Sequence, residues 1–138
     1  MACATTGAYQ EDIGDFQRYQ VMPTMDMQRY IDTPEVISAL LKTPRPLRPT
    51  DRDFLTINTD LNGDGRPDIV GTVDNFKFKE NGTYPLYILI GNQYDYDIMD
   101  STPRIRSFKV KVLDTSTNGF KDISADGKIY KFDGKKYE

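Results

Sequence analysis

The sequence contains no histidine and no tryptophan, and it has a single cysteine among its 138 residues. Histidine is the commonest general base and the commonest ligand of transition metals in proteins. Its absence excludes a serine–histidine–aspartate triad, a cysteine–histidine pair and a histidine-ligated zinc site within this chain. One cysteine cannot form an internal disulfide. No stretch approaches the roughly 18 consecutive apolar residues that a membrane-spanning helix needs.

The composition is that of a globular protein, with 38% hydrophobic and 12% aromatic residues and a net charge of -3. A chain of this length is one ordinary domain and can bury a core without disulfides. Nucleic-acid binding needs clustered lysine and arginine, and the mild acidity argues against it. The basic residues gather only at 104–111 and 128–136, where their spacing indicates solvated strand faces.

The N-terminal third predicts little regular structure apart from one helix. Residues 1–20 are polar and aperiodic, which predicts a flexible tether. Thr33 can cap a helix and Pro34 suits its first position, and apolar residues follow at helical spacing. We expect a short helix over about 33–42. The prolines of segment 43–49 end this helix and form a linker.

Strand and turn signals dominate from residue 53 onward. The dipeptides Asn81-Gly82 and Asp133-Gly134 are typical of hairpin turns. Five segments are rich in β-branched and aromatic residues, namely 54–57, 68–73, 84–90, 108–113 and 128–132. The predicted fold is therefore α+β and mostly antiparallel. A single β-rich domain over 21–138 would begin with the short helix and continue as two strand-loop-strand units in one sheet or sandwich.

Segment 60–68 reads Asp-Leu-Asn-Gly-Asp-Gly-Arg-Pro-Asp and places oxygen-bearing side chains at alternate positions. Ca²⁺ is a hard cation that takes six to eight oxygen ligands, and glycines allow the left-handed turns of a tightly curled loop. We expect one Ca²⁺ here, with water completing its coordination. The expected ligands are the side chains of Asp60, Asn62, Asp64 and Asp68 and the carbonyl of Arg66.

The loop is not an EF-hand, because its twelfth position is Gly71 rather than a bidentate glutamate. It resembles the calcium loop of FG-GAP and VCBS-type repeats, in which two strands flank an aspartate-rich turn. Segment 87–92, Tyr-Ile-Leu-Ile-Gly-Asn, resembles the strand that follows in such repeats. The resemblance covers less than a third of the chain, and the chain is too short for the many-bladed propeller that this family builds.

A second interpretation of the loop needs no metal. Aspartate and asparagine side chains also cap their own backbone in Asx-turns, which would make segment 60–68 an ordinary hairpin loop. The three carboxylates argue for a cation, since without one they repel each other. Both interpretations make predictions about where the side-chain oxygens point.

Segment 114–122 repeats the spacing with fewer acids. Two carboxylates should bind Ca²⁺ much more weakly than three, so the segment is either a weak second site or a degenerate repeat held by side-chain-to-backbone hydrogen bonds. In both cases the repetition predicts two similar units. The corresponding residues are Asp114, Ser116, Asn118, Phe120 and Asp122.

A cluster of tyrosine and aspartate is a candidate surface for a protein or sugar partner, because tyrosine offers a large contact area at little entropic cost. The alternative is an ordinary strand end with buried rings. The residues are Tyr94, Asp95, Tyr96 and Asp97.

The lone cysteine, Cys3, follows Met1 and Ala2. The segment resembles the start of a mature bacterial lipoprotein, in which a small residue precedes the lipidated cysteine. This resemblance implies a periplasmic or cell-envelope protein with a lipid anchor at Cys3. The alternative is an incidental thiol near a frayed terminus.

Three functions compete at this point. The first is a non-enzymatic, calcium-binding envelope protein that contacts an unidentified protein or envelope component. The second is an inhibitor or immunity protein against an envelope-degrading enzyme, acting through the tyrosine–aspartate cluster. The third is a small hydrolase that uses paired carboxylates, which the commitment of the best-grouped acids to segment 60–68 argues against.

Overall fold

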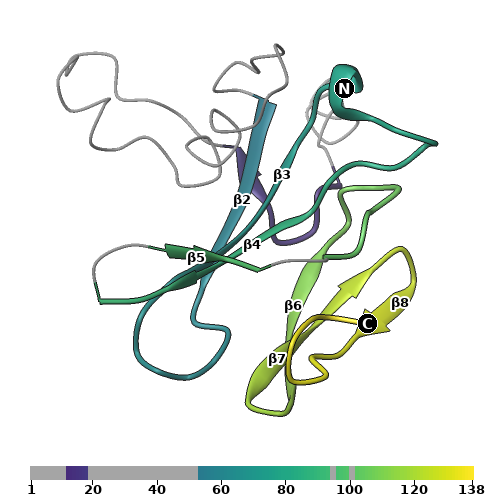
Figure 1. The fold of residues 1–138 in the computed structure, drawn as a ribbon. Helices are drawn as coiled ribbons and strands as arrows, with labels where there is room; N and C mark the ends of the chain where they lie inside the picture. The colour runs from purple at the N-terminus through teal and green to yellow at the C-terminus, as the bar shows by residue number, and fades with distance from the viewer. Residues whose placement is uncertain (1–11, 19–52, 94–95, 100–101) are drawn as a thin grey trace, which may run out of the picture.

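The computed structural model describes residues 12–18, 53–93, 96–99 and 102–138. These residues form two antiparallel sheets and one 3₁₀ turn, η2 (Phe76–Phe78), and no α-helix occurs among them (Figure 1). The prediction of an α+β fold is therefore wrong, because the described part of the chain is all-β. The prediction rested on the helical pattern of segment 33–42, whereas each long apolar segment in the described part pairs with another strand. The predicted helix, the tether over 1–20 and the linker over 43–49 lie outside the described residues.

The first sheet has five strands in the order β1-β2-β3-β4-β5, all antiparallel. Its central strand, β3, has all six residues buried, including the polar Asp68 and Thr72. The strand bounds are β1 Gln17–Arg18, β2 Phe54–Thr59, β3 Asp68–Val73, β4 Tyr87–Gly91 and β5 Tyr96–Ile98.

The second sheet has three strands in the order β6-β7-β8, namely β6 Lys111–Thr117, β7 Phe120–Ala125 and β8 Lys128–Tyr130. Thr117 pairs with Phe120, so only Asn118 and Gly119 form the turn between β6 and β7. Their φ angles of 52° and 85° suit a two-residue hairpin. Most of segment 114–122, predicted as a second and weaker loop, therefore lies in β6 and β7.

The main core lies between the two sheets. Leu55, Val70 and Ile88 come from the first sheet and Ile123 from the second, and all four are at most 1% exposed. Burying each such side chain contributes about 1.5–3 kcal/mol to folding. The three-stranded sheet lies beside the end of the first sheet that carries the loop between β2 and β3 (Figure 1).

The strand predictions vary in accuracy along the chain. Strand β3 has the predicted bounds of 68–73, and β2 contains the predicted segment 54–57. The segments predicted at 84–90 and 108–113 each begin three residues later in the structure. Within the described residues, no helix has the length and apolarity needed to cross a membrane.

Candidate metal centre

The loop between β2 and β3 is closed by the pairing of Thr59 with Asp68 at the ends of the two strands. Leu61 anchors the loop, since its side chain is only 1% exposed. Gly63 and Gly65 have φ angles of 73° and 84°, in the left-handed region that the sequence pattern requires. The chain therefore curls on itself between an anchored leucine and the start of β3.

The side chains of this loop accept hydrogen bonds from its own backbone. Asp60 Oδ1 accepts from the N–H of Gly63 and Oδ2 accepts from the N–H of Gly65, both at 2.9 Å. Asn62 Oδ1 accepts from the N–H of Asp64 at 3.3 Å. Asp64 Oδ1 accepts from the N–H of Arg66 at 2.9 Å. The contacts of Asn62 and Asp64 span two residues, as in Asx-turns, and together with those of Asp60 they hold the loop in its curled form.

Asp68 is fully buried and joins the loop to β4. Its Oδ2 accepts from the N–H of Leu61 and its Oδ1 from the N–H of Gly91, both at 2.7 Å. Burial raises the pKa of the Asp68 carboxyl, and the charges of Asp64 and Asp60 raise it further, although the two N–H groups lower it. The ionised loop thus holds negative charge that its backbone hydrogen bonds offset only in part.

Only glycine fits at position 91. A Cβ atom there would lie 2.5 Å from the carbonyl oxygen of Pro67. This close approach lets the N–H of Gly91 reach the Asp68 carboxylate. The sequence contains the signal as a glycine at the end of an apolar strand, but its partner across the sheet could not be predicted.

The acidic side chains of the loop do not converge on one point. Among the described residues, no three aspartate, glutamate or cysteine side chains lie close enough together to hold a metal ion. The chemistry of the donor set nevertheless fits Ca²⁺. Three carboxylates, the amide oxygen of Asn62 and the carbonyl of Arg66 are all hard oxygen donors. Each carboxylate oxygen has two lone pairs, so the backbone hydrogen bonds leave acceptor capacity for an ion.

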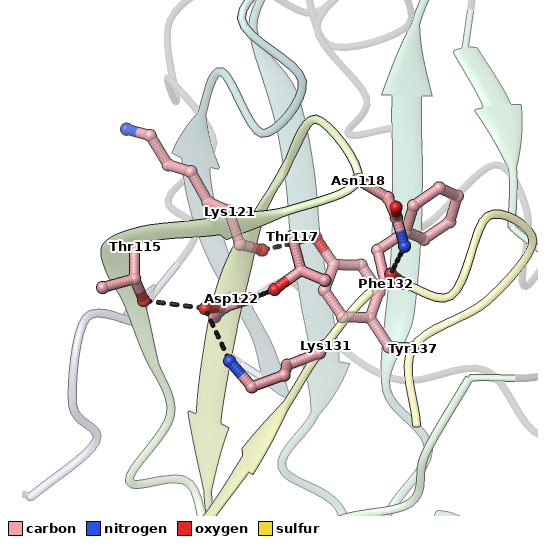
Figure 2. A network of polar contacts seen from close by, with 8 residues as sticks. All are labelled: Thr115, Thr117, Asn118, Lys121, Asp122, Lys131, Phe132 and Tyr137. Atoms are coloured by element: carbon pink, nitrogen blue, oxygen red, sulfur yellow. Dashed lines mark hydrogen bonds and ion pairs between the residues drawn. The ribbon is translucent and has the colours of Figure 1, made fainter.

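The second predicted site, in segment 114–122, lies on the hairpin of β6 and β7. Asp122 is 1% exposed and lies opposite the irregular stretch of β6, where the pairing shifts register. Its carboxylate accepts from Thr115 Oγ1 at 2.7 Å and from Thr117 Oγ1 at 2.8 Å, and Lys131 Nζ lies 3.4 Å away (Figure 2). The pKa of this carboxyl is lowered most by the hydroxyl of Thr115, and then by the hydroxyl of Thr117 and the ammonium of Lys131. A protein cation therefore already stands beside Asp122.

The remaining members of the second group point to other partners. Asn118 Nδ2 donates to the carbonyl of Phe132 at 2.8 Å, and the ring of Phe120 packs on the ring of Phe132 with centroids 4.1 Å apart (Figure 2 for the first contact). Asp114 and Ser116 are exposed on β6. The structure thus does not bring these five residues together around one centre.

A chain of hydrogen bonds that the sequence did not predict connects the loop to the second sheet. Leu61 donates its N–H to Asp68, and its carbonyl accepts from the N–H of Lys121 at 2.9 Å. The carbonyl of Lys121 accepts from the hydroxyl of Tyr137 at 2.7 Å (Figure 2). Burial raises the pKa of Tyr137, and the carboxylates of Asp122 and Asp68 raise it further. The carboxylates of both buried aspartates therefore act on one tyrosine hydroxyl.

The tyrosine–aspartate cluster is described only in part, because Tyr94 and Asp95 lie outside the described residues. Tyr96 is partly buried and packs against the small cluster on the other face of the first sheet. Asp97 is exposed, and its Oδ2 accepts from Asn92 Nδ2 at 3.1 Å. Cys3, the predicted lipidation site, also lies outside the described residues.

None of the protein-family models, curated proteins or solved structures compared with the chain matches it.

Proposed function

We propose that the chain is a non-enzymatic, calcium-binding protein of the cell envelope, in which loop 60–68 holds one Ca²⁺ ion. The ligands would be the side chains of Asp60, Asn62, Asp64 and Asp68 together with the carbonyl of Arg66. The role of the ion is structural. It fixes the connection between β2 and β3, and the protein then presents a stable surface to a protein partner or another envelope component.

The observation that carries this proposal is the charge balance of the loop. Three carboxylates lie within nine residues of one another, and one of them, Asp68, is fully buried. Burial is the main cause of the raised pKa of Asp68, and the charges of Asp64 and Asp60 add to it. A divalent cation at the loop reverses this effect, because it favours all three ionised carboxylates at once.

The backbone hydrogen bonds support the proposal as well as the metal-free interpretation. They curl the loop before any ion arrives, so less conformational entropy is lost on binding. Asp60 is partly exposed and Asp64 is exposed. A bound ion would require both side chains to turn toward Asp68, which Leu61 and Gly91 already fix.

The envelope assignment rests on the lipoprotein-like segment around Cys3 and on the resemblance of the loop to FG-GAP and VCBS-type repeats. A protein inhibitor or immunity protein is the second candidate. It is favoured by the position of Asp97 and the 48%-exposed Ile98 on β5, at the edge of the first sheet. Both candidates act by binding rather than by turnover.

Titration calorimetry of chelator-treated protein with CaCl₂ and with MgCl₂ tests the metal site. The native chain should bind one Ca²⁺, with Mg²⁺ binding at least tenfold more weakly, since Mg²⁺ demands a tighter octahedral site. Asp64→Asn should abolish binding, because it removes one of three carboxylates without changing side-chain shape. Asp114→Asn is the matched control, an exposed aspartate on β6. No heat of Ca²⁺ binding to the native chain would refute the proposal.

A further inference from the structure

A pocket of about 470 Å³ lies between the outer strands of the first sheet and the turn before the C-terminus. Strand β5 forms one wall, and it is an edge strand, since β4 is its only neighbour among the described strands. An edge strand presents N–H and C=O groups that can pair with an added strand. The lining residues are Ile90, Asp97, Ile98, Met99, Asp133, Lys135 and Lys136.

The wall formed by the first sheet is largely apolar. Ile90 and Met99 are partly buried and pack against the main core. Ile98 pairs with Leu89, so its side chain lies on the other face of the sheet and its backbone lines the pocket.

The opposite wall carries two lysines whose position is fixed by their turn. Asp133 Oδ1 accepts from the N–H groups of Lys135 and Lys136, at 2.8 and 2.9 Å. The ammonium group of Lys135 has no ion-pair partner in the described residues, and that of Lys136 lies 3.9 Å from the exposed Glu138. Both ammonium groups can therefore pair with a carboxylate from another molecule. Asp97 lies on the sheet wall, and Asp133 on the turn wall accepts hydrogen bonds from the two backbone N–H groups through its Oδ1.

We propose that this pocket binds an extended segment of a protein partner, with an acidic side chain next to an apolar one. The apolar side chain packs on Ile90 and Met99, and the carboxylate pairs with Lys135 and Lys136. The backbone N–H and C=O groups of the segment pair with the outer edge of β5. A peptide fits better than a simple anion, because it supplies N–H donors for the edge strand and for Asp97 as well as a carboxylate.

This inference deepens the protein-binding part of the proposed function and does not depend on the calcium site. The pocket residues are not among the proposed ligands of Ca²⁺. Peptide binding is therefore expected both with Ca²⁺ and with excess chelator. If the chain does not bind Ca²⁺, the peptide measurement still tests the pocket. If it binds no peptide, the Ca²⁺ measurement still tests the loop.

The test begins with selection of random dodecapeptides, displayed on phage, against the full native chain. The most enriched peptides are synthesised with a fluorophore, and their affinities are measured by anisotropy. Enriched sequences should carry an acidic residue adjacent to or two positions from an apolar one. The Lys135→Gln/Lys136→Gln variant should bind them at least tenfold more weakly.

The matched control is Lys77→Gln/Lys111→Gln, which changes the net charge equally at two exposed lysines outside the pocket. Its affinity should stay within twofold of the native value. Three results would overturn the proposal. These are a selection that enriches no peptide, as expected if the pocket holds only a small anion, equal binding to the native and pocket variants, and equal losses in the pocket and control variants.

Discussion

Replacing Asp122 with alanine tests whether the buried carboxylate of the second sheet stabilises the fold. The substitution removes two hydrogen bonds from the hydroxyls of Thr115 and Thr117. Bonds to a charged group contribute about 1.5–3 kcal/mol each, and less where the donor can turn to water, as that of exposed Thr115 can. The Lys131 side chain is 59% exposed, so its ion pair contributes at most about 1 kcal/mol.

The expected loss is roughly 2–4 kcal/mol in the free energy of unfolding at neutral pH. For a domain of this size, that loss lowers the melting temperature by roughly 6–15 °C. Circular dichroism during heating and urea titration both measure it. Asp114→Ala, at an exposed aspartate on the same sheet, is the control and should change the free energy by less than about 0.5 kcal/mol.

The pH dependence gives a second check on the same residue. The pKa of Asp122 is lowered below its ordinary value of 3.8, so the ionised carboxylate stabilises the folded chain. This contribution is fully present above pH 3.8 and is lost as the pH falls through the lowered pKa of the folded state. The difference between native chain and variant should therefore shrink only in acid. A variant as stable as the native chain at neutral pH would refute the reasoning.

Three further substitutions test other contacts by urea denaturation. Asp68→Asn in chelator should cost roughly 2 kcal/mol, because one amide oxygen cannot serve the two N–H groups that the carboxylate accepts from; an unchanged midpoint would contradict those contacts. Gly91→Ala should cost roughly 1–3 kcal/mol, since its Cβ would meet the Pro67 carbonyl, and a neutral result would mean that β4 does not approach the loop so closely. Tyr137→Phe should cost about 1 kcal/mol through loss of the bond to the Lys121 carbonyl, whereas full stability would place the hydroxyl elsewhere.

The sequence predicts strand β3 better than strand β5 for a physical reason. Strand β3 is buried on both faces, and its β-branched residues Ile69, Val70, Thr72 and Val73 give a strong strand signal. Strand β5 has only three residues and no periodicity to detect. The local residue pattern therefore predicts a strand that is buried along its whole length. It does not predict a short edge strand.

The hairpin between β6 and β7 shows two local signals in conflict. The spacing of Asp114 and Asp122 imitates a metal loop, while Asn118-Gly119 is one of the strongest hairpin signals. The hairpin is what forms, because both of these residues adopt the positive φ angles of a tight turn. The turn preference of this dipeptide therefore outweighs the spacing of the acids.

The candidate site could be predicted only where its residues are neighbours in sequence. Segment 60–68 is recognisable because its oxygen donors lie at alternate positions of one loop. The contact of Asp68 with Gly91 spans 23 residues, and the Lys121–Tyr137 bond joins β7 to the C-terminal segment. Such contacts depend on how the sheets pack, which periodicity does not encode.

The central claim is tested most directly by thermal unfolding of the native chain in CaCl₂, in MgCl₂ and in excess chelator, beside the Asp60→Asn/Asp64→Asn variant. These two positions are preferred to Asp68, whose replacement also breaks buried hydrogen bonds. At a free Ca²⁺ concentration of about 100 times Kd, binding adds about 2.7 kcal/mol to the free energy of unfolding. The account predicts a rise of roughly 10 °C with Ca²⁺ in the native chain alone. Identical melting temperatures in CaCl₂ and chelator would contradict it and leave loop 60–68 as a turn held by its own Asx hydrogen bonds.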